Sequence, residues 1–242
     1  MLHQSYTREV PGSRKAVLMI HGILGTPRHF DFLLPLIPED HAIYNLLLDG
    51  HGGTVDDFAR TSMKKWKAQV SATLDDLTQR YDSIILVAHS MGTLFSIQEA
   101  IARPEKIRHL FLLQVPLRPT LRPKYAFFTL FFPFGIILKG AAPMRNGSSL
   151  TLTPKLWKYV PWLPRFLELF AECAHTRKIL GQLTVPCQVF QACHDEMVLL
   201  KSSKDLRKHP HYQLYELQNS GHFYYPDQDA QLLKNEFSKL FQ

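Results

Sequence analysis

Short apolar runs alternate with amphipathic segments through the first 115 residues. Four runs have the length and composition of buried strands, and they span 16–20, 42–48, 84–87 and 107–113. Helices are predicted between and after them: a short one through Phe30 to Leu36, a long one over 63–81 and one over 94–103. The long helix follows from apolar side chains at steps of three and four residues, at Met63, Trp66, Val70, Leu74, Leu77 and Tyr81. Strands that alternate with helices predict a mostly parallel sheet with helices on both faces.

The alternation stops at Pro116 and resumes near residue 166. The stretch in between contains eight prolines and is rich in Phe, Lys and Arg. Beyond it, helices are predicted over 166–180, 201–208 and 230–241, and strands over 187–191 and 212–217. We therefore expect residues 1–115 and 181–242 to form one α/β core. Residues 116–180 are expected to form an inserted cap that ends in a return helix.

Positive charge is concentrated around the inserted segment. The chain of 242 residues is 45% apolar, which suits one large globular unit. The net charge of the chain is +7. Ten Lys or Arg and no acidic residue lie between Glu105 and Glu168, so the rest of the chain is net negative. A basic stripe is compatible with nucleic-acid binding, but no recognised nucleic-acid motif accompanies it. We therefore expect no nucleic-acid partner.

No segment of the chain predicts secretion or a membrane span. The first nine residues lack the apolar core of a signal peptide, and the three cysteines form no C-x-x-C pair, which favours reduced thiols and a cytoplasmic protein. The apolar stretch 125–138 is shorter than the roughly 20 residues of a transmembrane helix and is broken by a proline and a glycine. It is compatible with a lid helix over an acyl-chain pocket, with an element in weak contact with an anionic membrane, and with an ordinary core element of the cap.

Ser90 lies where a predicted strand turns directly into a predicted helix, in the sequence Ala88-His89-Ser90-Met91-Gly92. Such a turn brings its two backbone arms close together, so the residues two before and two after the serine must be small. Ala88 and Gly92 meet this requirement. The turn also leaves the Met91 N–H unpaired at a helix N-terminus, where it can stabilise an oxyanion. The pattern predicts that Ser90 is a nucleophile if a base and an acid lie nearby.

Two later strands end beside residues that would complete a serine-hydrolase site. Functional residues gather at the carboxyl ends of parallel strands. Asp195 follows the strand 187–191, and His222 follows the strand 212–217. The three residues occur in the order nucleophile, acid, base. Glu196 is an alternative acid, because only one side chain of a tight turn can face His222.

These residues, with the His21-Gly22 turn after the first strand, resemble the α/β-hydrolase family over nearly the whole chain. The Gly50-His51-Gly52-Gly53 loop and the spacing Asp195-x-x-Val198 look most like its carboxylesterase and monoacylglycerol lipase branch. The resemblance implies an α/β-hydrolase fold with an inserted cap, or lid. It also favours Asp195 over Glu196 as the acid.

The same resemblance assigns an oxyanion hole to the backbone amides of Ile23 and Met91. His21 is then expected to brace the loop that carries Ile23, and His89 to support the site with its side chain turned away from the reaction. His209-Pro210-His211 has the pattern of a solvated turn and lacks nearby Cys or acidic partners. We expect no metal and no cofactor.

Together these predictions favour cleavage of carboxylic esters through an acyl-enzyme on Ser90. The expected substrate is a small acyl ester with a short to medium chain, or a monoacylglycerol. A thioesterase or acyltransferase would use the same three residues and differ in what enters or leaves the acyl-enzyme. A non-catalytic receptor for a small ligand is a further alternative, because a fold does not determine a function.

Overall fold

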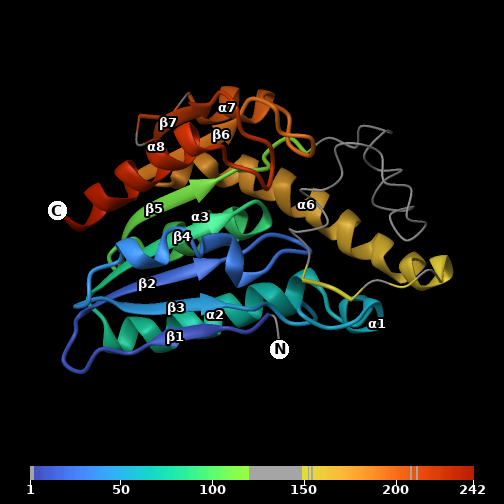
Figure 1. Ribbon diagram of the computed structural model, residues 1–242, viewed down its shortest axis with the longest axis horizontal. Coiled ribbons are helices and arrows are strands. Elements are labelled where there is room, and N and C mark those ends of the chain that lie inside the picture. Colours follow the sequence, from blue (N-terminus) through green and yellow to red (C-terminus); the bar gives the residue numbers. More distant parts are fainter. Residues whose placement is uncertain (1–2, 120–148, 152, 154, 208, 211) are drawn as a thin grey trace.

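A seven-stranded sheet forms the centre of the described fold (Figure 1). The computed structural model describes residues 3–119, 149–151, 153, 155–207, 209–210 and 212–242. In this part of the chain the strand order is β1-β3-β2-β4-β5-β6-β7. The strands are β1 (Tyr6–Arg8), β2 (Lys15–Ile20), β3 (Ala42–Leu46), β4 (Ser83–His89), β5 (Ile107–Leu113), β6 (Cys187–Ala192) and β7 (Tyr212–Leu217). All neighbouring pairs are parallel except β1 and β3, which confirms the predicted mostly parallel sheet.

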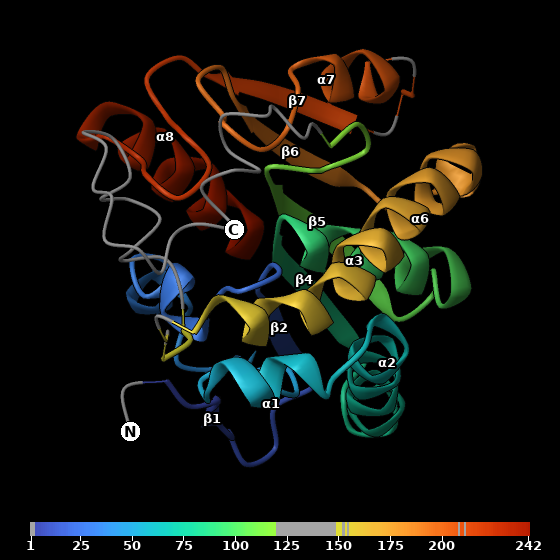
Figure 2. The same cartoon turned by 90° about the vertical axis from the view of Figure 1, so that its right-hand side faces the viewer.

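Helices cover both faces of this sheet (Figure 2). They are α1 (Val55–Ala59), α2 (Met63–Arg80), α3 (Met91–Ala102), α6 (Leu163–Ile179), α7 (Lys201–Leu206) and α8 (Asp227–Ser238). Trp66 of α2, Leu94 of α3 and Cys173 of α6 belong to the core on one face. Phe237 of α8 and Phe30 belong to the core on the other. Because both faces are covered, the central strands β2 and β4 are apolar along most of their length, at 16–20 and 84–88, as the sequence predicts.

Two short turns replace the helix predicted through Phe30 to Leu36. They are the 3₁₀ segments η1 (Pro27–Phe30) and η2 (Leu34–Leu36). Pro35 has no N–H to donate, so it prevents a continuous α-helical hydrogen-bond ladder through this region. The prediction of a helix here was therefore wrong.

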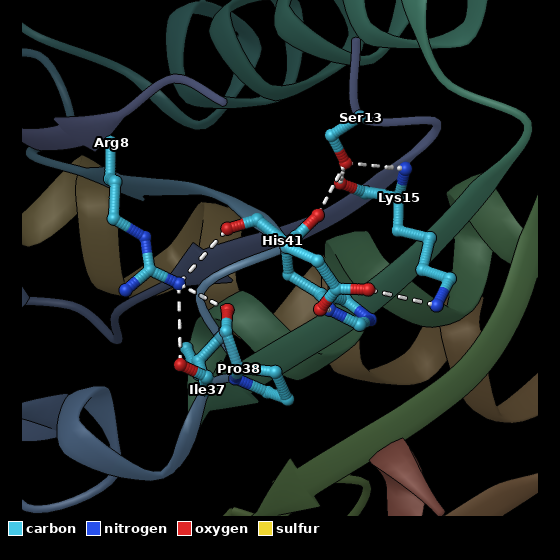
Figure 3. Close-up of polar contacts among 7 residues, drawn as sticks. Arg8, Ser13, Lys15, Ile37, Pro38 and His41 are labelled. Atoms are coloured by element: carbon cyan, nitrogen blue, oxygen red, sulfur yellow. Dashed lines mark hydrogen bonds and ion pairs between the residues drawn. The ribbon is translucent and has the colours of Figure 1, made fainter. Parts of the chain in front are cut away.

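The edge strand β1 is not apparent in the pattern of apolar residues, because it has only three residues and carries exposed side chains. Arg8 fixes it to the loop before β3 (Figure 3). Its Nη2 donates to the carbonyl oxygens of Ile37, Pro38 and His41 at 3.2, 2.6 and 3.0 Å. This side chain, with the antiparallel pairing to β3, holds the strand at the edge of the sheet.

The described part of the predicted insertion packs on α1 and α2. The 3₁₀ segment η4 (Leu156–Trp162) leads into α6, and the Trp162 ring lies 4.7 Å from that of Phe58. Trp162 also donates its Nε1–H to the carbonyl oxygen of Val55 at 2.9 Å. Glu172 on α6 accepts a bond from Lys67 on α2 at 2.6 Å. The apolar stretch 125–138 lies outside the described residues, and none of the helices within them combines the length and apolar content needed to span a bilayer.

Candidate active site

Ser90 occupies a strained turn between β4 and α3. Its φ of 50° and ψ of −121° are rare for an L-residue, and such a conformation costs about 1–3 kcal/mol. Its N–H donates to the Leu113 carbonyl at 2.9 Å, while its own carbonyl accepts from the Thr93 N–H at 2.9 Å. A Cβ on Gly92 would lie 2.2 Å from the main-chain oxygen of Ile20. Glycine is therefore required here, as the sequence predicts, but the neighbour that requires it is β2 and not the strand β4 that enters the turn.

The structure brings Ser90, Asp195 and His222 together at the carboxyl ends of the parallel strands. His222 Nε2 lies 3.1 Å from Ser90 Oγ, and His222 Nδ1 lies 2.7 Å from Asp195 Oδ2. An ionised carboxylate only accepts hydrogen bonds, so Nδ1 carries the proton and Nε2 is free to accept one from Ser90. All three residues are buried, with exposures of 6%, 7% and 2%.

Asp195 is held in place by the main chain of its own loop. Its Oδ1 accepts the N–H groups of Met197 at 2.7 Å and Val198 at 2.8 Å, which leaves Oδ2 for the His222 ring. Glu196, the alternative acid, does not face that ring. Its Oε2 accepts the main-chain N–H of His222 at 2.9 Å.

The loop after β2 passes directly beside the serine. A Cβ on Gly22 would lie 2.8 Å from Ser90 Cβ, so glycine permits this close approach. The main-chain N–H groups of Ile23 and Met91, both buried residues, have no acceptor among the described residues. Met91 is the first residue of α3, where the helix leaves its N–H groups unpaired. Unpaired donors beside the nucleophile are one requirement of an oxyanion hole.

Two buried histidines hold this loop in place through hydrogen bonds to main-chain groups. His21 Nδ1–H donates to the Gly22 carbonyl at 2.8 Å, and its Nε2 accepts the Leu48 N–H at 3.0 Å. His51 Nε2 accepts the Leu24 N–H at 3.1 Å. Burial lowers the pKa of His51 to about 4, and burial followed by the nearby His51 lowers the pKa of His21 well below its usual value. Both rings are therefore neutral at pH 7, which their accepting nitrogens require.

Ser149 is a contributor to the site that the sequence pattern does not reveal. Its N–H donates to the Leu24 carbonyl at 3.1 Å, and its hydroxyl accepts the Gly52 N–H at 3.1 Å. It thereby links the loop after β2 to the loop that contains His51. A single serine in a short polar stretch has no pattern that would have identified it.

Within the described ranges, no three His, Cys, Asp or Glu side chains are grouped in a way that could hold a metal ion. His209 packs its ring against Tyr212, at 5.4 Å, and lies away from the serine site. Cys193 is two residues from Asp195, and burial raises the pKa of its thiol, so it is a poor thiolate nucleophile at neutral pH.

The chain belongs to the α/β hydrolase family. The family profile matches residues 17–234, from β2 into α8, and thus includes every strand that carries a site residue. No curated protein is similar enough in sequence to match the chain.

Solved structures of several hydrolases share the fold at low sequence identity. One comes from work on LipS and LipT, two metagenome-derived lipolytic enzymes; it is 22% identical, with a TM-score of 0.75, over 98% of this chain and 97% of the other. A monoacylglycerol lipase from Paleococcus ferrophilus is 18% identical, with a TM-score of 0.67 and coverage of 98% and 97%. The thioesterase domain of a curacin biosynthetic pathway is 17% identical, with a TM-score of 0.64 and coverage of 98% and 94%.

Proposed function

We propose that the protein is a serine hydrolase that cleaves carboxylic esters through an acyl-enzyme on Ser90. The observation that carries this proposal is the continuous hydrogen-bonded chain from Ser90 through His222 to Asp195, buried at the carboxyl edge of the sheet. A serine hydroxyl is a poor nucleophile unless a base removes its proton. His222 Nε2 is placed to do so, and Asp195 orients the ring and stabilises its charged form.

The proposed reaction has two halves that use the same base. Ser90 Oγ bonds to the ester carbonyl carbon as its proton passes to His222, and the carbonyl electrons form an oxyanion near the Ile23 and Met91 amides. The carbonyl then re-forms, and the alcohol leaves with the proton from His222. Water next attacks the acyl-enzyme, again giving its proton to His222, and the carboxylic acid leaves as Ser90 recovers its hydrogen.

The outer face of η4 and α6 supports a lipid-like acyl ester as the substrate. Trp157, Val160, Leu163 and Leu167 are spaced by three or four residues and are 58–68% exposed, and we refer to them as the outer stripe. Such a group of large exposed apolar side chains is unusual on a surface that contacts only water. We propose that the outer stripe lies against the surface of an ester-containing lipid layer.

Charge around the outer stripe favours an anionic layer. Lys155, two residues before Trp157, has no ion-pair partner among the described residues. Lys158 and Arg165 contribute less free charge, because they pair with Asp56 and Glu168. The expected attraction is therefore weak and sensitive to salt.

A thioesterase is the second candidate, because the curacin thioesterase domain shares this fold over nearly the whole chain. The two functions differ in the bond that is cleaved and share the same three residues. Comparison of kcat/KM for an acyl thioester and for the oxoester of the same acyl chain separates them.

The proposal is tested by hydrolysis of p-nitrophenyl esters of increasing acyl length, with Ser90→Ala beside the wild type. Loss of the nucleophile is expected to lower kcat by about 10⁴-fold or more. Cys193→Ala is the control, because it removes the other nucleophilic side chain near Asp195, and it should retain wild-type turnover. Full activity in Ser90→Ala, or no turnover of any ester or thioester by the wild type, would contradict the proposal. The second outcome would favour a non-catalytic receptor.

A further inference from the structure

His222 is held by its main chain as well as by its ring. Its N–H donates to Glu196 Oε2 at 2.9 Å, and its carbonyl oxygen accepts from His89 Nε2, also at 2.9 Å. Glu196 is the sequence neighbour of Asp195, and His89 is the sequence neighbour of Ser90. Each of these two pairs therefore forms two hydrogen bonds with His222, one at the ring and one at the backbone.

The position of His222 in the chain explains why such contacts matter. It lies in the connection between β7 and α8, outside any helix or strand. The start of this connection is anchored by the Ser220 hydroxyl, which donates to Asp229 at 2.7 Å. At His222 itself, the hydrogen bonds of the main chain go to Glu196 and His89. A base must be held within about 0.5 Å of its productive position, and a loop alone does not provide that precision.

His89 is suited to this contact because it is buried and uncharged. It is 2% exposed, and its ring lies 4.9 Å from the His222 ring at an angle of 63°. Phe223 packs on both rings, and His29 packs on His89 at 5.4 Å. Burial lowers the pKa of His89 well below its usual value, and the neighbouring His222 lowers it further. His89 therefore donates one N–H without placing a positive charge beside the catalytic ring.

We infer that Glu196 and His89 are positioning residues that fix the main chain of His222 for proton transfer. The inference rests on the proposed function, since it gives these residues a role in that reaction. Glu196 also adds a negative charge next to the imidazolium that forms during the reaction. The polar side chains of the described residues that contact His222 by hydrogen bonds or ring packing are Ser90, Asp195, Glu196 and His89.

Substitutions at Glu196 separate its hydrogen bond from its charge. Glu196→Ala removes both and is expected to lower kcat by about 10–100-fold, because a small displacement of the base costs this much. KM should change little, since the substrate is not contacted. Glu196→Gln keeps an acceptor, so its kcat above neutral pH should stay within about threefold of the wild type. Its kcat/KM profile should move its acidic limb to lower pH, because loss of the negative charge makes His222 easier to deprotonate.

Substitutions at His89 test the other contact. His89→Phe keeps a ring of similar size but removes the donor, and it should lower kcat by about tenfold. His89→Gln restores an N–H donor and should recover part of the loss. Glu39→Gln, at an exposed loop position before β3, is the control for removal of a carboxylate and should match the wild type. Circular dichroism selects a temperature at which every variant is fully folded.

The inference would be overturned if Glu196→Ala and His89→Phe both kept wild-type kcat, or if the acidic limb of Glu196→Gln did not move. A purely structural role would lower the Tm and leave that limb in place. If Glu196→Ala does not fold, Glu196→Gln and the His89 pair still decide the outcome. Absence of turnover in the wild type would instead reject the proposed function. In that case NMR titration of the His222 ring, assigned by its loss in His222→Gln, still tests for a lower pKa in Glu196→Gln.

Discussion

The carboxyl edge of the sheet and the outer stripe are built in opposite ways. At the edge, Ser90, Asp195 and His222 are at least 93% buried, and each is held by hydrogen bonds from several elements. In the outer stripe, Trp157 and its neighbours are more than half exposed. At the edge, polar groups are buried, and in the stripe, apolar groups are left in water. Each of these arrangements costs free energy. Neither arrangement improves the stability of the fold, so each points to a function.

The two regions also differ in how tightly their positions are determined. Around Ser90, a single added methyl group at Gly22 or Gly92 would collide with a neighbouring element. The outer stripe faces away from the core, while Trp162 and Tyr159 on the same segment point inward. Substitutions at the edge should therefore have large effects on catalysis or folding, and substitutions in the stripe should affect only binding to a surface.

The largest effect is expected from Asp195→Asn. The amide cannot stabilise an imidazolium as the carboxylate does, and it can favour the wrong tautomer of His222, so kcat should fall about 10³–10⁴-fold. Steady-state kinetics on the best p-nitrophenyl ester measures this loss. Asp76→Asn, at an exposed position on α2, is the control and should keep kcat. A loss of less than tenfold in Asp195→Asn would show that the carboxylate is not the orienting group.

The next effect is a folding defect in Gly92→Ala. The new Cβ would lie 2.2 Å from the Ile20 oxygen, and that backbone atom belongs to β2 and cannot move freely. We expect the free energy of unfolding to fall by about 3 kcal/mol or more. Urea denaturation measures the change. In Gly181→Ala the new Cβ would make only an ordinary contact, 3.6 Å from His209. Its stability should stay within about 0.5 kcal/mol of the wild type, and equal stability of the two variants would refute the steric argument.

Gly92 and the buried strands also show why much of the fold could be predicted from the sequence. Buried parallel strands produce continuous apolar runs, and the turn at Ser90 requires small residues at fixed spacing, so both leave local signals. The α/β core and the positions of Ser90, Asp195 and His222 at strand ends followed from such signals. The start of helix α1 also has a local sequence signal, which the pattern of apolar residues does not include. Thr54 and Asp57 form a capping box there.

Other features depend on contacts between distant parts of the chain and have no local signal. β1 is held by Arg8, whose acceptors lie about thirty residues further along. The contact of Glu196 with the His222 main chain joins two loops, and the sequence presented Glu196 only as a competitor of Asp195. The pattern of apolar and polar residues does not predict which of two adjacent carboxylates faces a ring, because that depends on the geometry of the loop.

A third effect is a loss of folding stability at acidic pH, caused by buried histidines near the active site. The pKa of His51 is about 4 in the folded state, against an ordinary value of 6.5, so the unfolded chain binds an extra proton between these pH values. The contribution of the neutral His51 ring to the free energy of unfolding is complete above pH 6.5 and is lost as the pH falls to 4. For His51 it amounts to about 3 kcal/mol. His21 and His89 have pKa values shifted in the same direction and add to the loss.

Urea denaturation at pH 7.5 and 4.5 measures this dependence. His51→Gln cannot titrate, so its stability should fall less between the two pH values than that of the wild type. His175→Gln, at an exposed position on α6, is the control and should keep the full wild-type dependence. Identical pH dependence in the two variants would show that His51 is not a buried neutral ring.

The smallest effect is expected from substitutions in the outer stripe. Trp157→Ser with Leu163→Ser removes two exposed apolar side chains and should weaken binding to anionic phospholipid vesicles about tenfold or more in sedimentation assays. Their exposure predicts a change in stability within about 0.5 kcal/mol. Hydrolysis of a soluble short-chain ester should be unchanged, because the triad lies elsewhere. Tyr6→Ser, which removes an exposed aromatic ring from β1, should bind vesicles like the wild type. If the double variant bound as well as the wild type, the stripe would not be the lipid contact. If instead it lost activity on soluble esters, the two regions would not act independently.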